Sequence, residues 1–141
     1  RLLSRGLGDV YKRQVIDNVT GEIRGVEALV RLMWNGRMLS PGLFLQVAEE
    51  TGQIAGIDQQ VLLKAARQVM AWNREFGRDL ELAVNVSGAH IGRADVFEEV
   101  MDALDKSGLK PENLVLEITE SSCSRMPTRW PSASICCADW A

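Results

Sequence analysis

Strand-like and helix-like segments alternate along most of this chain, and that alternation restricts its fold more than any other feature. Strands are predicted at about 23–31, 80–87 and 114–119, where branched apolar residues recur with a period of two. Amphipathic helices are predicted between them. The segment from Asn85 to Glu117 has the size of one strand–helix–strand unit. This order is typical of α/β folds, in which helices cover parallel strands.

Capping residues mark both ends of three predicted helices. Serine and aspartate accept hydrogen bonds from the first turn of a helix, and glycine readily adopts the left-handed conformation that ends one. The starts are Ser40-Pro41, Asp58 and Asp95 (with Glu98 as a capping box), and the ends are Gly52, Gly77 and Gly108. A turn at Thr20-Gly21 after residues 15–18 predicts a further N-terminal strand, which pairs as a hairpin with the strand at 23–31.

Length and composition limit the functions that the chain can have. The chain has 141 residues, fewer than the roughly 200–250 that a complete (β/α)8 barrel needs. Its net charge of −3 gives no broad basic surface for a nucleic-acid polymer. The sequence contains no long apolar run that predicts a membrane segment, and its start lacks the apolar region of a signal peptide. A cytoplasmic protein is expected.

The two ends of the chain differ from its body. Residues 1–14 show no regular period and are interpreted as read-through from a linker. Residues 122–141 combine Ser, Pro, Cys and Trp without periodicity, so a frameshifted tail is predicted, with a genuine, poorly ordered tail as the alternative. All three cysteines lie in this tail, far from the single histidine, His90, which argues against a zinc site. His90 is interpreted as a surface loop residue.

Each predicted strand has one purely apolar face, because side chains alternate between the two surfaces of a sheet. Those faces are expected to pack against helices. The opposite faces carry polar side chains as well, and in a barrel they would line the interior. The apolar faces are Val26, Ala28 and Val30, then Leu82, Val84 and Val86, then Leu114, Leu116 and Ile118.

Three oxygen-bearing side chains share the opposite faces. Glu27, Asn85 and Glu117 each lie near the end of a strand. A divalent cation would compensate the cost of burying the carboxylates, and a set without His or Cys favours Mg²⁺ or Mn²⁺ over zinc. Arg31 follows Glu27 on the same face, where its guanidinium could bind a phosphate. Taken singly, a salt-bridged Glu or a turn Asn would explain each residue, and the spacing alone leaves both interpretations open.

Several sequence motifs, which follow one another in a defined order, point to one protein family. Residues Gly25 to Arg31 read Gly-Val-Glu-Ala-Leu-Val-Arg and resemble the signature of the EAL family, whose name is the tripeptide at Glu27. Further matching blocks follow in the family's order at compatible spacing: Ser40-Pro41, Phe44, Ala-Glu-Glu-Thr-Gly at 48–52, Asn85-Val-Ser87, and Glu117-Ile-Thr-Glu-Ser121. The chain is therefore identified as a member of this family over about 15–121, roughly the N-terminal half of the domain.

The resemblance implies a fold, a reaction and a set of site residues. The fold is a (β/α)8 TIM-like barrel of the EAL type, truncated at about half, with an antiparallel first strand. The reaction is hydrolysis of cyclic-di-GMP to linear pGpG, assisted by two Mg²⁺ or Mn²⁺ ions in the complete domain. Glu27, Asn85 and Glu117 would be metal ligands, the two glutamates would be catalytic, and Arg31 and Leu29 would bind substrate. The parent protein is expected to be a homodimer fused to sensory or GGDEF domains.

The sequence also departs from the family pattern. The family's Asp-Asp-Phe-Gly block and the lysine that follows it should come after residue 121, where the aperiodic tail stands. The 141-residue chain by itself is therefore expected to be inactive. The alternative is a degenerate EAL domain that binds cyclic-di-GMP or a protein partner without hydrolysis. The three intact candidate ligands favour the enzyme, and the ordered motifs argue against an unrelated metabolic barrel.

Overall fold

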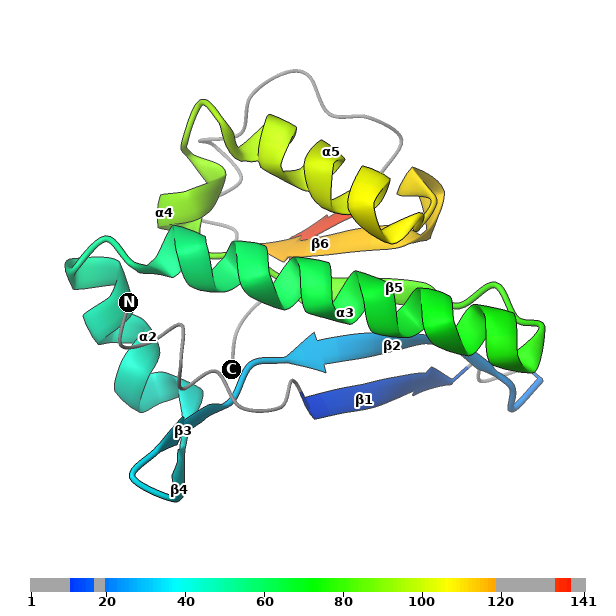
Figure 1. Cartoon of the computed structure of the whole chain (residues 1–141), viewed down its shortest axis with the longest axis horizontal. Helices are drawn as coiled ribbons and strands as arrows, with labels where there is room; N and C mark the ends of the chain where they lie inside the picture. The colour runs from blue at the N-terminus through cyan, green and yellow to red at the C-terminus, as the bar shows by residue number, and fades with distance from the viewer. Residues whose placement is uncertain (1–10, 17–19, 119–133, 138–141) are drawn as a thin grey trace.

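The computed structural model describes residues 11–16, 20–118 and 134–137, and within them one five-stranded sheet organises the chain (Figure 1). The strands from β2 onward run parallel, whereas β1 is antiparallel to β2. In spatial order they are β1 (Tyr11–Ile16), β2 (Ile23–Leu29), β5 (Glu81–Asn85), β6 (Leu114–Ile118) and β7 (Ser134–Cys137). The predicted α/β fold with a parallel sheet is confirmed.

The outer strands β1 and β7 reach into the flanks of the chain, where no regular element was predicted. β1 already begins at Tyr11, which pairs with Leu29, and β7 pairs with β6 in register from Ser134 opposite Val115. Both are edge strands that are held to the sheet by backbone hydrogen bonds. Such a strand can form without alternating apolar and polar side chains. The interpretation of 1–14 as a linker and of 122–141 as a frameshifted tail stays a prediction, and most of those residues lie outside the described part.

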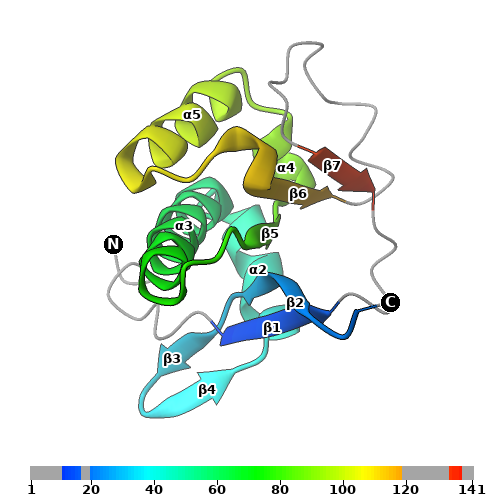
Figure 2. The same ribbon diagram turned by 90° about the vertical axis from the view of Figure 1, so that its right-hand side faces the viewer.

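Helices α3 and α5 cover one face of the sheet (Figures 1 and 2). α3 packs on β2 and β5, and α3 and α5 pack against each other. Within the described residues no helix is long and apolar enough to cross a membrane. The helices are α2 (Pro41–Glu50), α3 (Ile54–Phe76), α4 (Gly88–Ile91) and α5 (Val96–Ser107), followed by a 3₁₀ turn at Pro111–Asn113.

The predicted helix starts are right for two helices and wrong for one. Ser40 occupies the N-cap position of α2 with Pro41 in its first turn, and Asp95 occupies the N-cap position of α5, but neither side chain makes a capping hydrogen bond. The positions of these two helix starts are therefore confirmed, whereas the Asp95 hydrogen bond of the predicted capping box is not formed. Asp58 does not cap α3, because the helix already begins at Ile54 and Asp58 lies buried within it. The carboxylate of Asp58 instead accepts a hydrogen bond from the backbone N–H of Ser87, which follows β5. A buried tertiary partner has therefore replaced the local capping role.

The hydrophobic core lies between the sheet and the helices, and it contains the apolar strand faces expected from the sequence. Val30 is partly buried, and the other eight side chains of those faces are buried. From α3 the core receives side chains such as Leu62 and Val69. Burying one Leu, Ile or Val side chain contributes about 1.5–3 kcal/mol, so this layer fixes which surface of each strand faces the helices. The polar residues on the same strands must then lie on the other surface.

Gly25 allows β2 and β5 to approach closely. It is paired in register with Glu81, and a Cβ atom at position 25 would lie only 2.7 Å from the Glu81 carbonyl oxygen. A larger residue would push the two strands apart. Because Gly25 precedes Glu27 by one full alternation, this close approach also sets the position of Glu27 beside β5, opposite Ala83.

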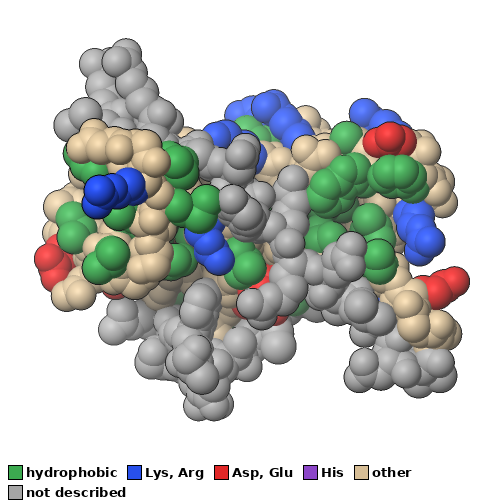
Figure 3. Space-filling view, turned by 90° about the horizontal axis from the view of Figure 1, so that it is seen from below, with side chains coloured by type: hydrophobic (Ala, Val, Ile, Leu, Met, Phe, Trp, Pro, Cys, Tyr) green, Lys and Arg blue, Asp and Glu red, His purple; other side chains and the backbone are tan. Residues whose placement is uncertain are grey.

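A small hairpin that sequence analysis missed follows β2. It consists of β3 (Leu32–Trp34) and β4 (Arg37–Leu39), joined by Asn35 and Gly36, which both have positive φ angles of 48° and 75°. An Asn-Gly pair is the usual residue choice for such a turn, so the signal was present in the sequence. This hairpin and the α2 helix that follows it carry five exposed apolar side chains: Met33, Trp34, Met38, Leu43 and Val47. Figure 3 shows hydrophobic side chains on the surface of the molecule that is seen from below.

Candidate active site

The three predicted oxygen ligands lie close together on three adjacent strands. Glu27 is in β2, Asn85 is the last residue of β5, and Glu117 in β6 is the register partner of Asn85. The amide nitrogen Nδ2 of Asn85 donates a hydrogen bond to Oε1 of Glu27 at 3.3 Å. All three side chains are half-buried, on the surface of the sheet that faces away from the core. The strand alternation therefore brings them together.

The negative charges of Glu27 and Glu117 lie close together, and holding both charges there is unfavourable unless a positive charge compensates them. Partial burial raises the pKa of Glu117, and the nearby negative charge of Glu27 raises that pKa further. Like charges held near one another disfavour simultaneous ionisation. Asn85 offsets part of this cost through its hydrogen bond to Glu27, but it adds no positive charge. A cation between the carboxylates would remove the repulsion.

The donor atoms fit a hard divalent cation. Carboxylate oxygens of Glu27 and Glu117, with the amide oxygen of Asn85, form an all-oxygen set of the kind that Mg²⁺ or Mn²⁺ prefers. Across the described ranges no group of three or more His, Cys, Asp or Glu side chains is placed to hold a metal. The set thus supplies two carboxylates and one amide, and a complete coordination shell would need additional ligands such as water or phosphate.

Replacing Glu117 with Gln should stabilise the chain in EDTA-containing buffer at pH 7. The neutral amide removes the repulsion from Glu27 and the cost of partly burying a charge. Because solvent screens this half-exposed pair, the expected gain in the free energy of unfolding is below about 1 kcal/mol. Urea unfolding of both chains measures it, with Glu112→Gln as control, because Glu112 is the exposed residue of the 3₁₀ turn. Added Mg²⁺ should stabilise the unmodified chain more than the variant, and a variant less stable than the unmodified chain in EDTA would contradict the arrangement.

The two predicted substrate-binding residues lie at the carboxyl end of β2. Leu29 is the last residue of β2 and is half-buried. Arg31 lies beyond the strand, and its Nη1 donates a hydrogen bond to the Val30 carbonyl oxygen at 2.8 Å. Because β2 ends before Arg31, strict strand alternation does not extend to it. Its position near the carboxyl edge of the sheet agrees with a phosphate contact, and that role stays a prediction.

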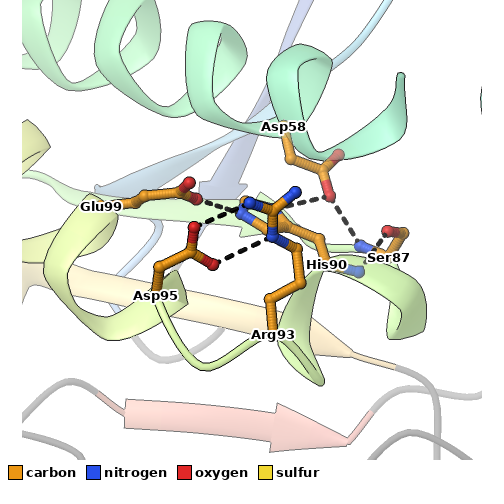
Figure 4. Close-up of polar contacts among 6 residues, drawn as sticks. All are labelled: Asp58, Ser87, His90, Arg93, Asp95 and Glu99. Atoms are coloured by element: carbon orange, nitrogen blue, oxygen red, sulfur yellow. Dashed lines mark hydrogen bonds and ion pairs between the residues drawn. The ribbon is translucent and has the colours of Figure 1, made fainter. Parts of the chain in front are cut away.

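The interpretation of His90 as a surface loop residue is wrong. His90 lies in α4, with only 3% of the residue exposed. Its Nδ1 is 3.2 Å from Oδ2 of Asp58, and its Nε2 is 2.5 Å from Oε2 of Glu99 (Figure 4). One sequence signal pointed to this cluster: Asp58 lies within the apolar stripe of α3, between Ile57 and Val61, where a charged side chain needs a buried partner.

These observations define the class of protein. The chain forms an α/β domain in which two acidic residues and an amide meet near the carboxyl ends of parallel strands, the location of active sites in barrel enzymes. A family model described as the EAL domain matches residues 3–137, so the match extends into both flanks. The chain belongs to the EAL domain family.

Curated relatives are identical to this chain at a third or more of the positions that align with it. The bifunctional diguanylate cyclase/cyclic di-GMP phosphodiesterase MucR of Pseudomonas aeruginosa is 39% identical over 108 residues, which make up 74% of this chain and 16% of MucR. The oxygen sensor protein DosP of Escherichia coli is 35% identical over 115 residues, which cover 79% of this chain and 14% of DosP. The chain thus spans a small part of the length of the curated relatives it matches.

Solved structures of EAL domains have a similar fold. A structure of the MucR phosphodiesterase in complex with c-di-GMP superposes with a TM-score of 0.80 at 35% identity, covering 88% of this chain and 50% of that one. The EAL domain of Xanthomonas citri FimX, also in complex with c-di-GMP, gives a TM-score of 0.72 at 25% identity and covers 87% of this chain and 47% of that one. The chain therefore matches about half of each solved domain chain.

Proposed function

We propose that the domain to which this chain contributes hydrolyses cyclic-di-GMP to linear pGpG with Mg²⁺ or Mn²⁺ as cofactor. The observation that carries the proposal is the meeting of Glu27, Asn85 and Glu117 on three adjacent strands. The reaction comes from the family: relatives such as MucR and NbdA of Pseudomonas aeruginosa are named as cyclic di-GMP phosphodiesterases. The residues that resemble the family's metal ligands are thus the ones that the fold brings together.

Each residue has a separate part in this proposal. Glu27, Asn85 and Glu117 would hold the cation, and the hydrogen bond from the Asn85 amide nitrogen would also orient the Glu27 carboxylate. A divalent ion bound here acidifies water and offsets negative charge on the phosphodiester. Arg31 binds a phosphate oxygen with its guanidinium, and Leu29 provides an apolar contact for the nucleotide.

We also propose that this chain supplies the first half of a TIM-like barrel with an antiparallel first strand. Its match to 50% of the solved MucR chain supports this division, as does the antiparallel pairing of β1 with β2. A second ion would then depend on residues of the other half. The names of relatives, a bifunctional cyclase/phosphodiesterase and an oxygen sensor, support a parent in which the EAL domain is fused to GGDEF or sensory domains. That this parent is a homodimer is a further part of the proposal.

A chimeric domain tests the proposed reaction. Residues 11–118 of this chain would be joined to the C-terminal half of the MucR phosphodiesterase domain, which supplies the remaining strands. We expect Mg²⁺-dependent conversion of cyclic-di-GMP to pGpG, measured by chromatography, and its loss in the Glu27→Gln chimera. A folded chimera that binds cyclic-di-GMP in the presence of Mg²⁺ without hydrolysing it would favour a degenerate binding module instead.

The 141-residue chain alone should not hydrolyse cyclic-di-GMP. It lacks the family's Asp-Asp-Phe-Gly block and the lysine after it, so water and phosphate cannot both be positioned for reaction. The same chromatographic assay, run for hours at high enzyme concentration, measures this, with the chimera as positive control. Metal-dependent release of pGpG by the chain itself would show that its own residues suffice.

A further inference from the structure

A buried histidine joins three helices at the end of the sheet that carries Asn85. His90 in α4 lies between Asp58 of α3 and Glu99 of α5, with one carboxylate oxygen near each ring nitrogen (Figure 4). The side chains are 4% exposed for His90, 10% for Asp58 and 19% for Glu99. The partners are 32 and 9 residues away from His90 in sequence. This cluster is separate from Glu27 and Glu117 and has no part in the proposed hydrolysis.

The geometry favours the charged form of His90. A neutral imidazole carries one N–H, so it can donate to only one carboxylate and would turn a lone pair toward the other. The imidazolium donates to both. Burial by itself lowers the pKa of His90, but the hydrogen bonds and negative charges of Asp58 and Glu99 outweigh burial, so that the pKa is raised above its ordinary value.

The other charged groups near the imidazole lie in the connection between α4 and α5. Arg93 and Asp95 form a two-point ion pair, with Nε–Oδ1 and Nη2–Oδ2 distances of 2.9 and 2.7 Å, and both side chains are about half exposed. Asp95 also interacts with the charge of His90, and Arg93 with that of Glu99. Three carboxylates therefore surround the imidazole against one guanidinium, and the surroundings favour a positive His90.

The cluster is linked through the backbone to the candidate active site. Oδ2 of Asp58, the atom nearest His90, also accepts a hydrogen bond from the Ser87 backbone N–H at 2.9 Å. The preceding residue, Val86, donates its N–H to the Glu117 carbonyl oxygen at 2.9 Å. Asn85 comes directly before these two residues. The chain just after Asn85 is thus held to β6 on one side and to α3 on the other.

We propose that Asp58, His90 and Glu99 form a proton-dependent clamp that holds the carboxyl end of β5, and with it the Asn85 side chain, in place against α3. Loss of the proton leaves two buried carboxylates with one donor fewer between them, which loosens the contact of Asp58 with Ser87. His90 is then a positioning residue. Its effect on catalysis rests on the proposed function, whereas the clamp itself does not.

The sign of the pH dependence follows from the raised pKa. The stabilisation is fully present below the ordinary histidine pKa of about 6.5, and it is lost as pH rises through the higher pKa of the folded chain. The structure is therefore expected to be tightest at this end of the sheet in mildly acidic to neutral solution, and looser in alkaline solution.

Nitrogen-15 NMR of the 141-residue chain tests the clamp, because His90 is its only histidine. We expect both ring nitrogens to carry protons at pH 6 and the titration midpoint to lie above that of the same chain in urea. The side-chain amide of Asn85 should shift with the same midpoint. The side-chain amide of Asn113, which donates to Asp79 at 2.7 Å, serves as control and should not follow that midpoint.

Variants separate positioning from simple packing. Asp58→Asn and Glu99→Gln should each lower the His90 midpoint, and His90→Gln should abolish the shift of the Asn85 amide above pH 6. A His90 midpoint no higher than in urea would overturn the proposal, as would a native spectrum identical to the urea spectrum. So would an Asn85 shift that persists in His90→Gln. This experiment does not measure hydrolysis. A failure of the clamp proposal can therefore be distinguished from a failure of the proposed function.

Discussion

In a complete domain built around this chain, Glu27→Ala should reduce the single-turnover rate of cyclic-di-GMP hydrolysis by about 10²–10³-fold, the usual loss when one group that stabilises transition-state charge is removed. Nucleotide binding should change far less. A carboxylate that holds the cation acts mainly on the attacking water and on charge that develops at the phosphate, so its loss is felt in the transition state more than in the bound substrate.

The experiment compares single-turnover kinetics with calorimetric binding in the chimeric domain. Glu22→Ala is a matched control, because Glu22 is an exposed glutamate just before the opposite end of β2. Near-normal turnover in Glu27→Ala would show that Glu27 is not a ligand. Of the two carboxylates, only Glu117 would then remain as a candidate ligand, and hydrolysis would have to depend on other residues.

Arg31→Ala should weaken binding and turnover together, each by about 10–100-fold, the range expected for one or two charge-assisted hydrogen bonds to phosphate. A group that holds the phosphate contributes to the bound substrate and to the transition state alike, so the binding constant and kcat/KM should fall in parallel. Calorimetry and steady-state kinetics on the same chimera measure the two effects.

Two further variants test the assignment of Arg31. Arg31→Lys should restore binding only in part, because lysine keeps the charge but loses the planar pair of donors. Arg37→Ala, an exposed arginine in β4, is the control and should leave both quantities near their original values. Unchanged binding in Arg31→Ala would mean that Arg31 serves the fold, where it already contacts the Val30 carbonyl, rather than the substrate.

Both predictions start from residues that the sequence already singled out. Glu27 was placed beside Asn85 and Glu117 by alternation along three strands, and the structure brings the three together. This was possible because the side-chain period of a strand is a local property: once the apolar set faces the helices, the polar set has only one other surface. The start of α2 after Ser40 was predictable for the same reason, since proline in the first turn of a helix is a local signal.

Predictions from local sequence patterns were wrong where a residue's structure depends on a partner that is distant in sequence. Asp58 is a residue type that often caps a helix, but it lies inside α3, where its carboxylate accepts a hydrogen bond from the Ser87 backbone N–H and pairs with the His90 ring. His90 looked like a loop residue because nothing within a few positions marks it as buried. β7 carries no strand period and is placed by pairing with β6.

The sequence by itself determined the alternation of strands and helices, the surface of each strand that enters the core, and the candidate ligand set of Glu27, Asn85 and Glu117. Those properties depend on side-chain period and on capping, which act over a few residues. Only the tertiary structure decided the partners of Asp58 and His90, the start of β1 at Tyr11 and the extension of the sheet beyond β6. Such contacts join segments that are far apart in sequence, and no local periodicity indicates which segments meet. They can therefore be identified only in the folded chain.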